Sequence, residues 1–526
     1  MPPPKPSLNE LMQTVKANVK KYRAERPSLL KPTTSMLKMD EPEIESSSRA
    51  ADQEVDTVEI CPEHPEYMII GTYSLVKKGE PCDYEGQSRR GTLQVMTVAS
   101  NPRPKYAGML PPQLDKVAFS CAVLDIHFHP TDRSLLGVAT SNAEMHFFRF
   151  IIHGDVLGRR TITKLLLLGT ITVAENDEHG LVPLVTQFTW FPEIRTRGVS
   201  GISDMEDISF AATTSFGDVK VIKTSIPAIK VLFDDRLSQP SDPIPVISTD
   251  IHKHDLEAWT VTTITLNSSE SKSNANHCMI LSGGDDSALI ASAVGLPRIT
   301  SQPNSPSISP SDIPDIIVQP LWKDRRSHTA GVVSILPLLF PNNSGLDTEH
   351  ETISFVTGSY DEYLRVFELD AKTLRAHFKT ELRLNGGVWR LKILDQYDTT
   401  SETSVTASTG PSPNTIYQSG TRMERHQNTL ILASLMHAGA AVLRLTYSSP
   451  FDSSQGTWTI TLVKTFRTGH ESMVYCCDAR RDTGNEALSQ KESTPTYTVV
   501  STSFYDMKIC AWTFADQFKG QIPAPR

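Results

Sequence analysis

One pattern of residues recurs along this chain and constrains its fold more than any other feature. In residues 355–369, an apolar run leads into a turn of Gly, Ser, Tyr, Asp and Glu, and alternating apolar residues follow. This order is typical of two strands joined by a tight turn, and it makes up half of a blade in a WD-repeat β-propeller. Residues 279–290 and 497–512 repeat the pattern closely.

The turns of seven such copies are evenly spaced. Three copies align on Asp286, Asp361 and Asp506, and four weaker copies place their turns at positions 74, 142, 217 and 437. Consecutive turns are 68, 75, 69, 75, 76 and 69 residues apart. Because a typical repeat has about 40–45 residues, each blade must carry inserted loops. We therefore predict an all-β fold over residues 51–520, a seven-bladed WD-repeat β-propeller with long inter-strand insertions.

Some segments do not fit the repeat. Residues 1–50 form an N-terminal extension, in which residues 8–25 have the spacing of an amphipathic helix and an acidic, Ser-rich linker follows. This helix either packs loosely or docks on another surface. We expect mobile polar insertions near residues 77–90, 300–316, 396–427 and 480–496.

The charge balance restricts the kind of partner. Lys and Arg number 51 and Asp and Glu number 60, so the net charge is −9. This balance argues against direct nucleic-acid binding and suits a cationic partner. The seven cysteines include no C-x-x-C pair, no secretory signal precedes them, and no apolar run approaches the ~20 residues of a membrane span. We expect a cytoplasmic monomer with reduced thiols and with no metal or cofactor.

The aspartates at the repeat turns have a structural role in most WD-type repeats. Each accepts a hydrogen bond from the His that precedes its blade, and His254, His328 and His470 are the matching histidines. His437 departs from this pattern, because it occupies the turn position that Asp holds in the neighbouring copies. A break in a repeat is expected where function overrides a local rule, although a packing variant would look the same.

Aromatic residues accompany the turns and the blade starts. Trp259, Trp389, Tyr360 and Tyr505 either pack the blades together or form a wall for a cationic ligand. The chain contains no nucleophile elbow, metalloprotease motif, phosphate-binding loop or dinucleotide fingerprint. A hydrolytic reaction would therefore need water or a hydroxyl group activated by His or Asp side chains from separate blades.

Seven short motifs, in this order, resemble the diphthine methylesterases, which are WD-repeat proteins of diphthamide biosynthesis. They are residues 254–259, 282–286, 328–334, 357–362, 386–391, 436–437 and 503–506. The resemblance covers roughly residues 52–514. The chain departs from the family in its N-terminal 50 residues, in the Ser/Pro insertion at 300–316, and in Phe367, where the repeat usually has Trp.

The resemblance implies a carboxylic-ester hydrolase that acts on translation elongation factor 2. Water would remove the methyl ester of diphthine methyl ester and give diphthine and methanol. The fixed trimethylammonium cation of diphthine suits aromatic and acidic side chains.

Within this reaction, His437 would activate water or accept its proton, and Asp361 or Asp286 would orient it. Tyr360, Trp389, Tyr505 and Trp259 would hold the cation. The alternative is a non-catalytic WD-repeat scaffold, such as a trafficking or ubiquitin-ligase adaptor.

Overall fold

The computed structural model describes most of the chain after residue 43. The described residues are 44–75, 89–98, 113–154, 161–191, 205–228, 244, 246–266, 275–297, 316–338, 353–370, 372–408, 417–450, 456–482 and 494–518. Within them, 28 strands form seven four-stranded antiparallel sheets. The predicted helix at residues 8–25 lies outside the described residues.

Six of the sheets are built from four consecutive strands each. The first two contain β2 (Val55–Ile60), β3 (Tyr67–Leu75), β4 (Arg89–Thr97) and β5 (Gln113–Phe119), then β6 (Val123–Phe128), β7 (Leu135–Thr140), β8 (Glu144–Gly154) and β9 (Thr161–Thr172). The next two contain β10 (Val185–Trp190), β11 (Met205–Thr214), β12 (Asp218–Pro227) and β13 (Val246–Lys253), then β14 (Ala258–Thr265), β15 (Ala275–Gly284), β16 (Leu289–Pro297) and β17 (Ile317–Asp324). The last two contain β18 (Val332–Leu338), β19 (Ile353–Ser359), β20 (Tyr363–Leu369) and β21 (Ala376–Arg383), then β22 (Arg390–Ser408), β23 (Tyr417–Ser434), β24 (Ala440–Pro450) and β25 (Thr457–Phe466).

The seventh sheet joins the two ends of the propeller. Its strands are β26 (Val474–Arg481), β27 (Thr496–Ser503), β28 (Lys508–Ala515) and β1 (Ser46–Ala50). β1 pairs antiparallel with β28, with Ser48 opposite Cys510. Residues 46–50, which we had assigned to the extension, therefore belong to the propeller. Their polar sequence hid the strand, because an outermost strand needs backbone pairing more than a buried side-chain face.

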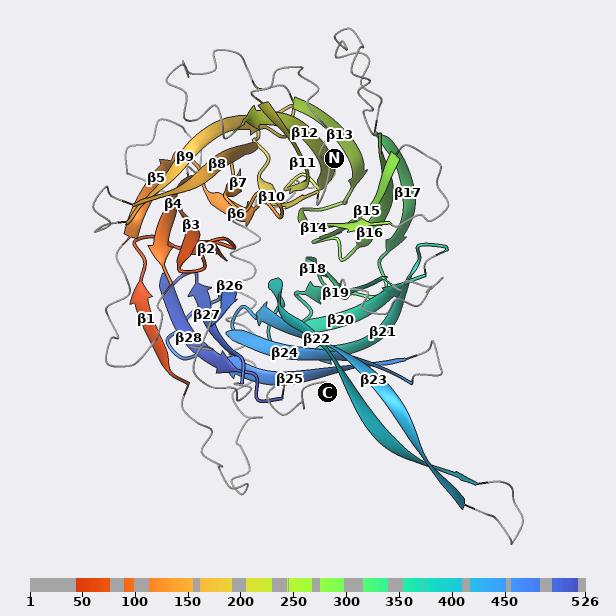
Figure 1. Ribbon diagram of the computed structural model, residues 1–526. Helices are drawn as coiled ribbons and strands as arrows, with labels where there is room; N and C mark the ends of the chain where they lie inside the picture. Colours follow the sequence, from red (N-terminus) through yellow and green to blue (C-terminus); the bar gives the residue numbers. More distant parts are fainter. Residues whose placement is uncertain are drawn as a thin grey trace, which may run out of the picture. The chain divides into compact units, whose positions relative to one another are not determined.

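The seven sheets surround a common axis (Figure 1). The first strand of each consecutive set lies innermost, and the strands that end each sheet, such as β5, β9 and β13, lie at the rim. This arrangement confirms the predicted seven-bladed propeller. Six of the seven turn positions fall between the second and third strands of a sheet, and the first, Ser74, is the next-to-last residue of β3.

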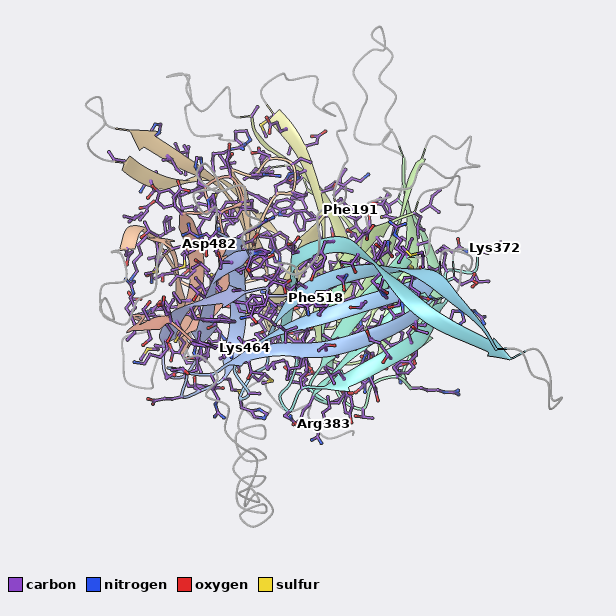
Figure 2. The ribbon with its side chains drawn as sticks, turned by 60° about the horizontal axis from the view of Figure 1, so that its bottom comes forward. Phe191, Lys372, Arg383, Lys464, Asp482 and Phe518 are labelled. Atoms are coloured by element: carbon purple, nitrogen blue, oxygen red, sulfur yellow. The ribbon has the colours of Figure 1, made fainter. Side chains whose placement is uncertain are left out.

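The polar segment 396–427 is not the loop that we expected. β22 and β23 continue through it as paired strands, and the register runs from Arg390 opposite Ser434 to Ser408 opposite Tyr417. The two strands extend beyond β24 and β25 as a ribbon (Figures 1 and 2). The pairing of β23 with β24 ends at Glu424, so the outer part of the ribbon has only two strands, and its polar sequence reads as a loop. Most of the other three predicted insertions lies outside the described residues.

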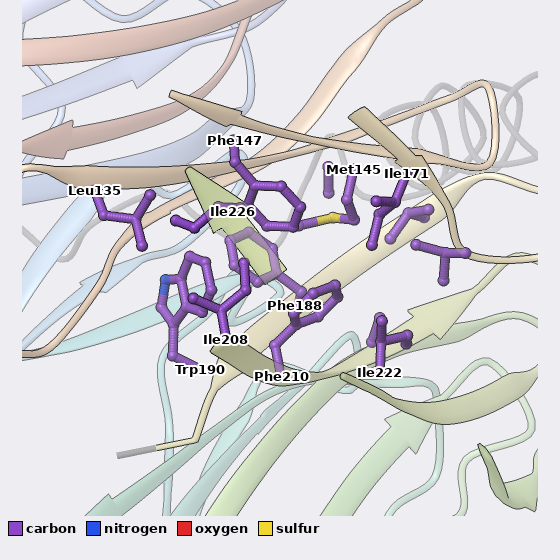
Figure 3. Packing of buried hydrophobic residues seen from close by; sticks show 14 of the residues in the cluster. Leu135, Met145, Phe147, Ile171, Phe188, Trp190, Ile208, Phe210, Ile222 and Ile226 are labelled. Carbon is purple, nitrogen blue, oxygen red and sulfur yellow. The ribbon is translucent and has the colours of Figure 1, made fainter. Parts of the chain in front are cut away.

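Apolar side chains fill the spaces between neighbouring blades. Between the sheets that contain β8 and β10, Phe147, Phe188, Trp190 and Phe210 pack in one cluster (Figure 3). The Trp190 ring lies edge-on to Phe188 and Phe210, with centroids 5.4 and 5.8 Å away. Edge-to-face packing of this kind adds to the area that the rings bury. Each blade thus depends on its neighbours, as a propeller requires.

Two further features follow from the described residues. The cysteines among them are free and buried: Cys61, Cys121, Cys278, Cys476, Cys477 and Cys510. Among the same residues there is no helix long and apolar enough to cross a membrane.

Candidate functional site

The innermost strands share a device that turns one residue out of the regular ladder. In six of the seven, a β-bulge falls at the second residue of the strand. The bulged residues are Asp56, Leu124, Thr186, Trp259, Val333 and Tyr475. Bulges re-aim side chains and are over-represented next to active sites. Trp389 holds the matching place before β22, where its N–H donates to the Ser434 carbonyl at 3.0 Å.

The bulges and the turns between second and third strands lie at the same edge of each sheet. In one blade, for example, Val332 at the start of β18 pairs with Ser359 at the end of β19. Tyr360 follows Ser359, so the turn places it beside the bulge. Both sets of residues therefore meet on one face of the propeller, around its axis.

Seven aromatic rings on this face form a continuous chain of contacts, which we call the aromatic arc. Its members are Tyr73, Trp259, Tyr360, Trp389, Tyr475, Phe504 and Tyr505. Trp389 is its centre, with ring centroids 5.7 Å from Trp259, 5.6 Å from Tyr360 and 5.1 Å from Tyr475. From Tyr475 the arc continues to Phe504 at 5.2 Å.

Several rings of the arc reach solvent. Trp259, Tyr360 and Trp389 are half-buried, and Tyr505 is exposed. The indole Nε1 of Trp259 is buried, and the carboxyl group on which it acts is that of Asp285. Ring faces that reach solvent are available to a ligand.

Two acidic groups accompany the arc. Burial raises the pKa of Asp285 to about 6, although the nearby Trp259 indole acts to lower it. Burial also raises the pKa of Asp56 to about 7, against the lowering effect of Arg390. Acids whose pKa is displaced toward neutrality by burial are characteristic of functional sites.

A group of charged residues links the innermost strands β2 and β6 to Arg390. His127 lies between two carboxylates, with its Nε2 3.1 Å from Asp125 and its Nδ1 3.1 Å from Glu59. These carboxylates raise the pKa of His127 to about 10, so its imidazole is a cation at neutral pH. Asp125 also accepts a hydrogen bond from Arg390 at 3.4 Å, and the Arg390 guanidinium lies 5.9 Å from the Trp389 ring centroid.

The four aromatic residues singled out in the sequence thus meet in one place. Trp389 contacts both Trp259 and Tyr360. Tyr505 joins the arc through Phe504, and the centroids of these two rings are 5.1 Å apart. Their role in binding a substrate stays a prediction. The described residues contain no group of three or more His, Cys, Asp or Glu side chains that could hold a metal ion.

The turn aspartates take part in structural contacts. Asp286 pairs with His254 Nδ1 at 2.8 Å, as expected for the repeat, while the other imidazole nitrogen bonds Ser282 Oγ at 2.7 Å. Asp361 departs from the pattern, because Arg365 donates to it at 2.9 Å. In that blade, His328 instead bonds Thr357 Oγ1 at 2.8 Å.

The last blade satisfies its histidine in a third way. His470 bonds Ser501 and Ser503, each at 2.7 Å, and Trp512 donates to Ser501 Oγ at 3.2 Å. Asp506 accepts from the Ser472 hydroxyl at 2.6 Å. The Asp–His bond expected for three blades therefore forms directly in one. Arg365 takes the place of His328 on Asp361, and the Ser472 hydroxyl takes that of His470 on Asp506. The Nδ1 of His328 has no hydrogen-bond partner among the described residues.

His437 lies in the turn between β23 and β24. Its side chain is exposed and has no hydrogen-bond partner among the described residues. Among the described residues, His437 makes no hydrogen bond or ion pair with Asp286 or Asp361, whose partners include His254 and Arg365. The catalytic role of these three residues stays a prediction.

Comparison with known proteins gives one similar sequence. A relative from Schizosaccharomyces pombe (strain 972 / ATCC 24843), "Diphthine methyltransferase", is 23% identical over 470 residues. The similarity covers 89% of this chain and 97% of the relative. It spans nearly the whole of both chains.

Two other comparisons add little to this relationship. No protein-family model matches the chain. Among solved structures, Saccharomyces cerevisiae Sqt1 aligns with 89% of this chain and 99% of its own, at 11% identity and a TM-score of 0.39.

Sequence reasoning missed Asp56, Asp285 and Tyr475 as members of the site. Asp285 immediately precedes the turn residue Asp286, and Asp56 opens the apolar run of the first blade. The available signal was an acidic residue at a blade start, where other blades have Leu124 or Val333. Together, the arc and the two acids offer surfaces for a cation and a group able to exchange a proton near neutral pH.

Proposed function

We propose that this protein hydrolyses the methyl ester of diphthine methyl ester on translation elongation factor 2. The observation that carries the proposal is the aromatic arc with Asp285 and Asp56 beside it. A quaternary ammonium ion has no N–H to donate, so it is recognised by aromatic faces and negative charge. Trp259, Tyr360 and Trp389 present such faces together.

The similarity to a protein named for methyl chemistry on diphthine supports the same substrate class. The printed name describes transfer of a methyl group, whereas the proposed reaction removes one by transfer of the acyl group to water. The two reactions differ in what they consume, because a methyltransferase needs a methyl donor and a hydrolase needs only water.

Tyr505, at the exposed end of the arc, extends the surface proposed for the cation. His437 lies in a turn on the same face and would contact the substrate protein or its leaving group there. In this proposal the elongation factor is a protein substrate of a cytoplasmic monomer, and no nucleic acid contacts the site directly.

The direct test uses the purified protein and elongation factor 2 that carries methylated diphthine. We expect methanol to be released with no methyl donor and no second enzyme. Methylation that requires an added sulfonium methyl donor would show that the name of the relative applies literally. Binding without methanol release or methyl transfer would favour the non-catalytic scaffold.

A further inference from the structure

Asp56 is unusual among the residues at the innermost bulges. The other bulged residues are apolar, aromatic or hydroxyl-bearing, whereas Asp56 is the acidic one. Its side chain is half-buried and makes no hydrogen bond to any described residue. A half-buried carboxyl group without a hydrogen bond destabilises the fold. Because the other blades have uncharged residues at this bulge, the acidic residue here indicates a function.

The groups around Asp56 come from several blades. Arg390 and Asp125 act on its charge from β22 and β6, and Asp56 in turn acts on Tyr73, Tyr360 and Tyr505 of the aromatic arc. These interactions, together with its bulge at the start of β2, place Asp56 near both the arc and the Arg390–Asp125 pair. A substrate whose cation rests on the arc would have its neighbouring atoms close to Asp56.

Arg390 is held in place from two sides. Its guanidinium bonds Asp125 at 3.4 Å and lies over the Trp389 ring, and its side chain is only 16% exposed. Asp125 is itself fixed by the Phe188 N–H at 3.2 Å and by the His127 cation. One of the five guanidinium N–H groups is used by Asp125, and the others have no bond to a described residue.

The charges around this point also matter. His127 and Arg390 are cations, and Asp125 and Glu59 are the carboxylates that they contact. These four charges sum to zero, so the four groups add no excess of negative charge where Arg390 presents its remaining N–H groups. Such a fixed donor, already oriented before reaction, is the arrangement that stabilises a developing oxyanion.

We propose that Asp56 is the general base that activates water at this site and that Arg390 stabilises the oxyanion of the ester carbonyl. The inference rests on the proposed hydrolysis. Asp56 takes a proton from water as the water oxygen bonds to the carbonyl carbon, and Arg390 donates to the tetrahedral oxyanion. The intermediate collapses by breaking the bond to the methoxy oxygen, which receives the proton from Asp56 and leaves as methanol. The product is a carboxylate, and its proton passes to solvent.

The acids predicted from the repeat are less suited to this step. The carboxylate of Asp286 is occupied by His254, and that of Asp361 by Arg365. Both contacts lower the pKa of the aspartate and make it a weaker base. A base with a pKa near the working pH is more effective.

The ionisation of Asp56 predicts the pH dependence. Its pKa is about 7, so the base form increases as the pH rises through 7. The groups that face it are Arg390, Asp125 and the three tyrosines of the arc. The tyrosine pKa values are raised by burial, so these groups stay neutral in this range.

The test measures methanol release from the methyl-esterified elongation factor by wild type, Asp56→Asn, Asp56→Glu and Arg390→Gln. Asp250→Asn serves as a matched control on the rim, where that carboxylate is 78% exposed. We expect Asp56→Asn to lower kcat at least about 100-fold, as loss of a general base does. We expect a similar loss for Arg390→Gln, since removal of an oxyanion donor costs about 100- to 1,000-fold. The KM of Asp56→Asn and the activity of Asp250→Asn should change little.

Each other outcome has a distinct meaning. If wild type releases methanol and folded Asp56→Asn does so within about threefold with the same pH profile, Asp56 is not the base and the proposed function stands. If His437→Ala, measured beside these variants, is the inactive one, the base lies in the turn between β23 and β24. If wild type releases no methanol, both proposals fail. Should Asp56→Asn not fold, an unchanged pH profile in Asp56→Glu would overturn the role of Asp56.

Discussion

Trp259 and Trp389 belong to blades that are not neighbours, yet their ring centroids lie 5.7 Å apart. The blade between them has Val333 at the matching bulge, and this side chain is small and buried. A large residue at that position would separate the two indoles. The small bulge residue therefore permits aromatic side chains from two blades to form one surface around the axis.

The two indoles should bind a quaternary ammonium ion. We expect choline to bind the protein more tightly than 3,3-dimethylbutan-1-ol, its uncharged isostere, in a calorimetric titration. Trp389→Ala should weaken choline binding about 10- to 30-fold, because a desolvated cation–π contact contributes roughly 2 kcal/mol. Trp322→Phe, which changes a tryptophan of the outer strand β17, should leave the affinity unchanged. Equal binding of both compounds would contradict a cation site.

Gly331 leaves room for the arc. A Cβ atom added there would lie 2.7 Å from Asp285 Oδ1 and 3.0 Å from a ring carbon of Tyr360, so both groups would have to move. We expect Gly331→Ala to weaken choline binding several-fold while the protein stays folded. Gly387→Ala is the matched comparison, because its added Cβ meets the flexible end of Met436 at 2.5 Å and is 3.5 Å from Tyr360. An equal loss in both variants would show that the effect is not specific to the Asp285 side of the site.

The stability of the protein should report the ionisation of Asp56. Its folded pKa of about 7 lies above the ordinary value of 3.8, so the folded state favours the protonated carboxyl. The loss of folding stability caused by ionising Asp56 is absent below pH 4, grows as the pH rises toward 7, and is complete above pH 7. Asp56→Asn should therefore be more stable than wild type at pH 8. The difference is a few kcal/mol at most, because each unit of pKa shift corresponds to about 1.4 kcal/mol. Urea unfolding at pH 5 and pH 8 should show a smaller difference at pH 5.

The buried pair of His254 and Asp286 should matter for stability. The two side chains are 0% and 5% exposed and lie 2.8 Å apart. Replacing the carboxylate by an amide loses a charge-assisted hydrogen bond at a buried site, which costs about 1–3 kcal/mol. We expect Asp286→Asn to unfold at clearly lower urea concentration than wild type. Asp255→Asn, which changes an exposed neighbour, should unfold near the wild-type midpoint.

The closing strand gives a prediction about the ends of the propeller. A chain without residues 1–43 keeps β1, whereas a chain without residues 1–51 leaves the edge of β28 unpaired. An unpaired strand edge promotes association with other chains. We expect the longer deletion to lower the thermal midpoint by several degrees and to aggregate, and the shorter deletion to do neither. Light scattering during thermal unfolding distinguishes the two chains.

The sequence predicted those features that depend on local order. The spacing of turns gave seven blades, and the aromatic residues beside the turns, Trp259, Tyr360 and Trp389, lie together as an arc. The sequence did not reveal β1, because its pairing with β28 joins residues more than 450 positions apart. Asp56 and Tyr475 were missed for the same reason, since they approach the other members only when the ring closes.

The most direct test of the account follows the oxygen atom of water through the reaction. The methyl-esterified elongation factor is incubated with wild-type protein in water enriched in oxygen-18, and the modified peptide and the methanol are analysed by mass spectrometry. Attack of water on the carbonyl carbon predicts one labelled oxygen in the new carboxylate and none in the methanol. Label in the methanol with an unlabelled carboxylate, or no reaction without a methyl donor, would contradict it.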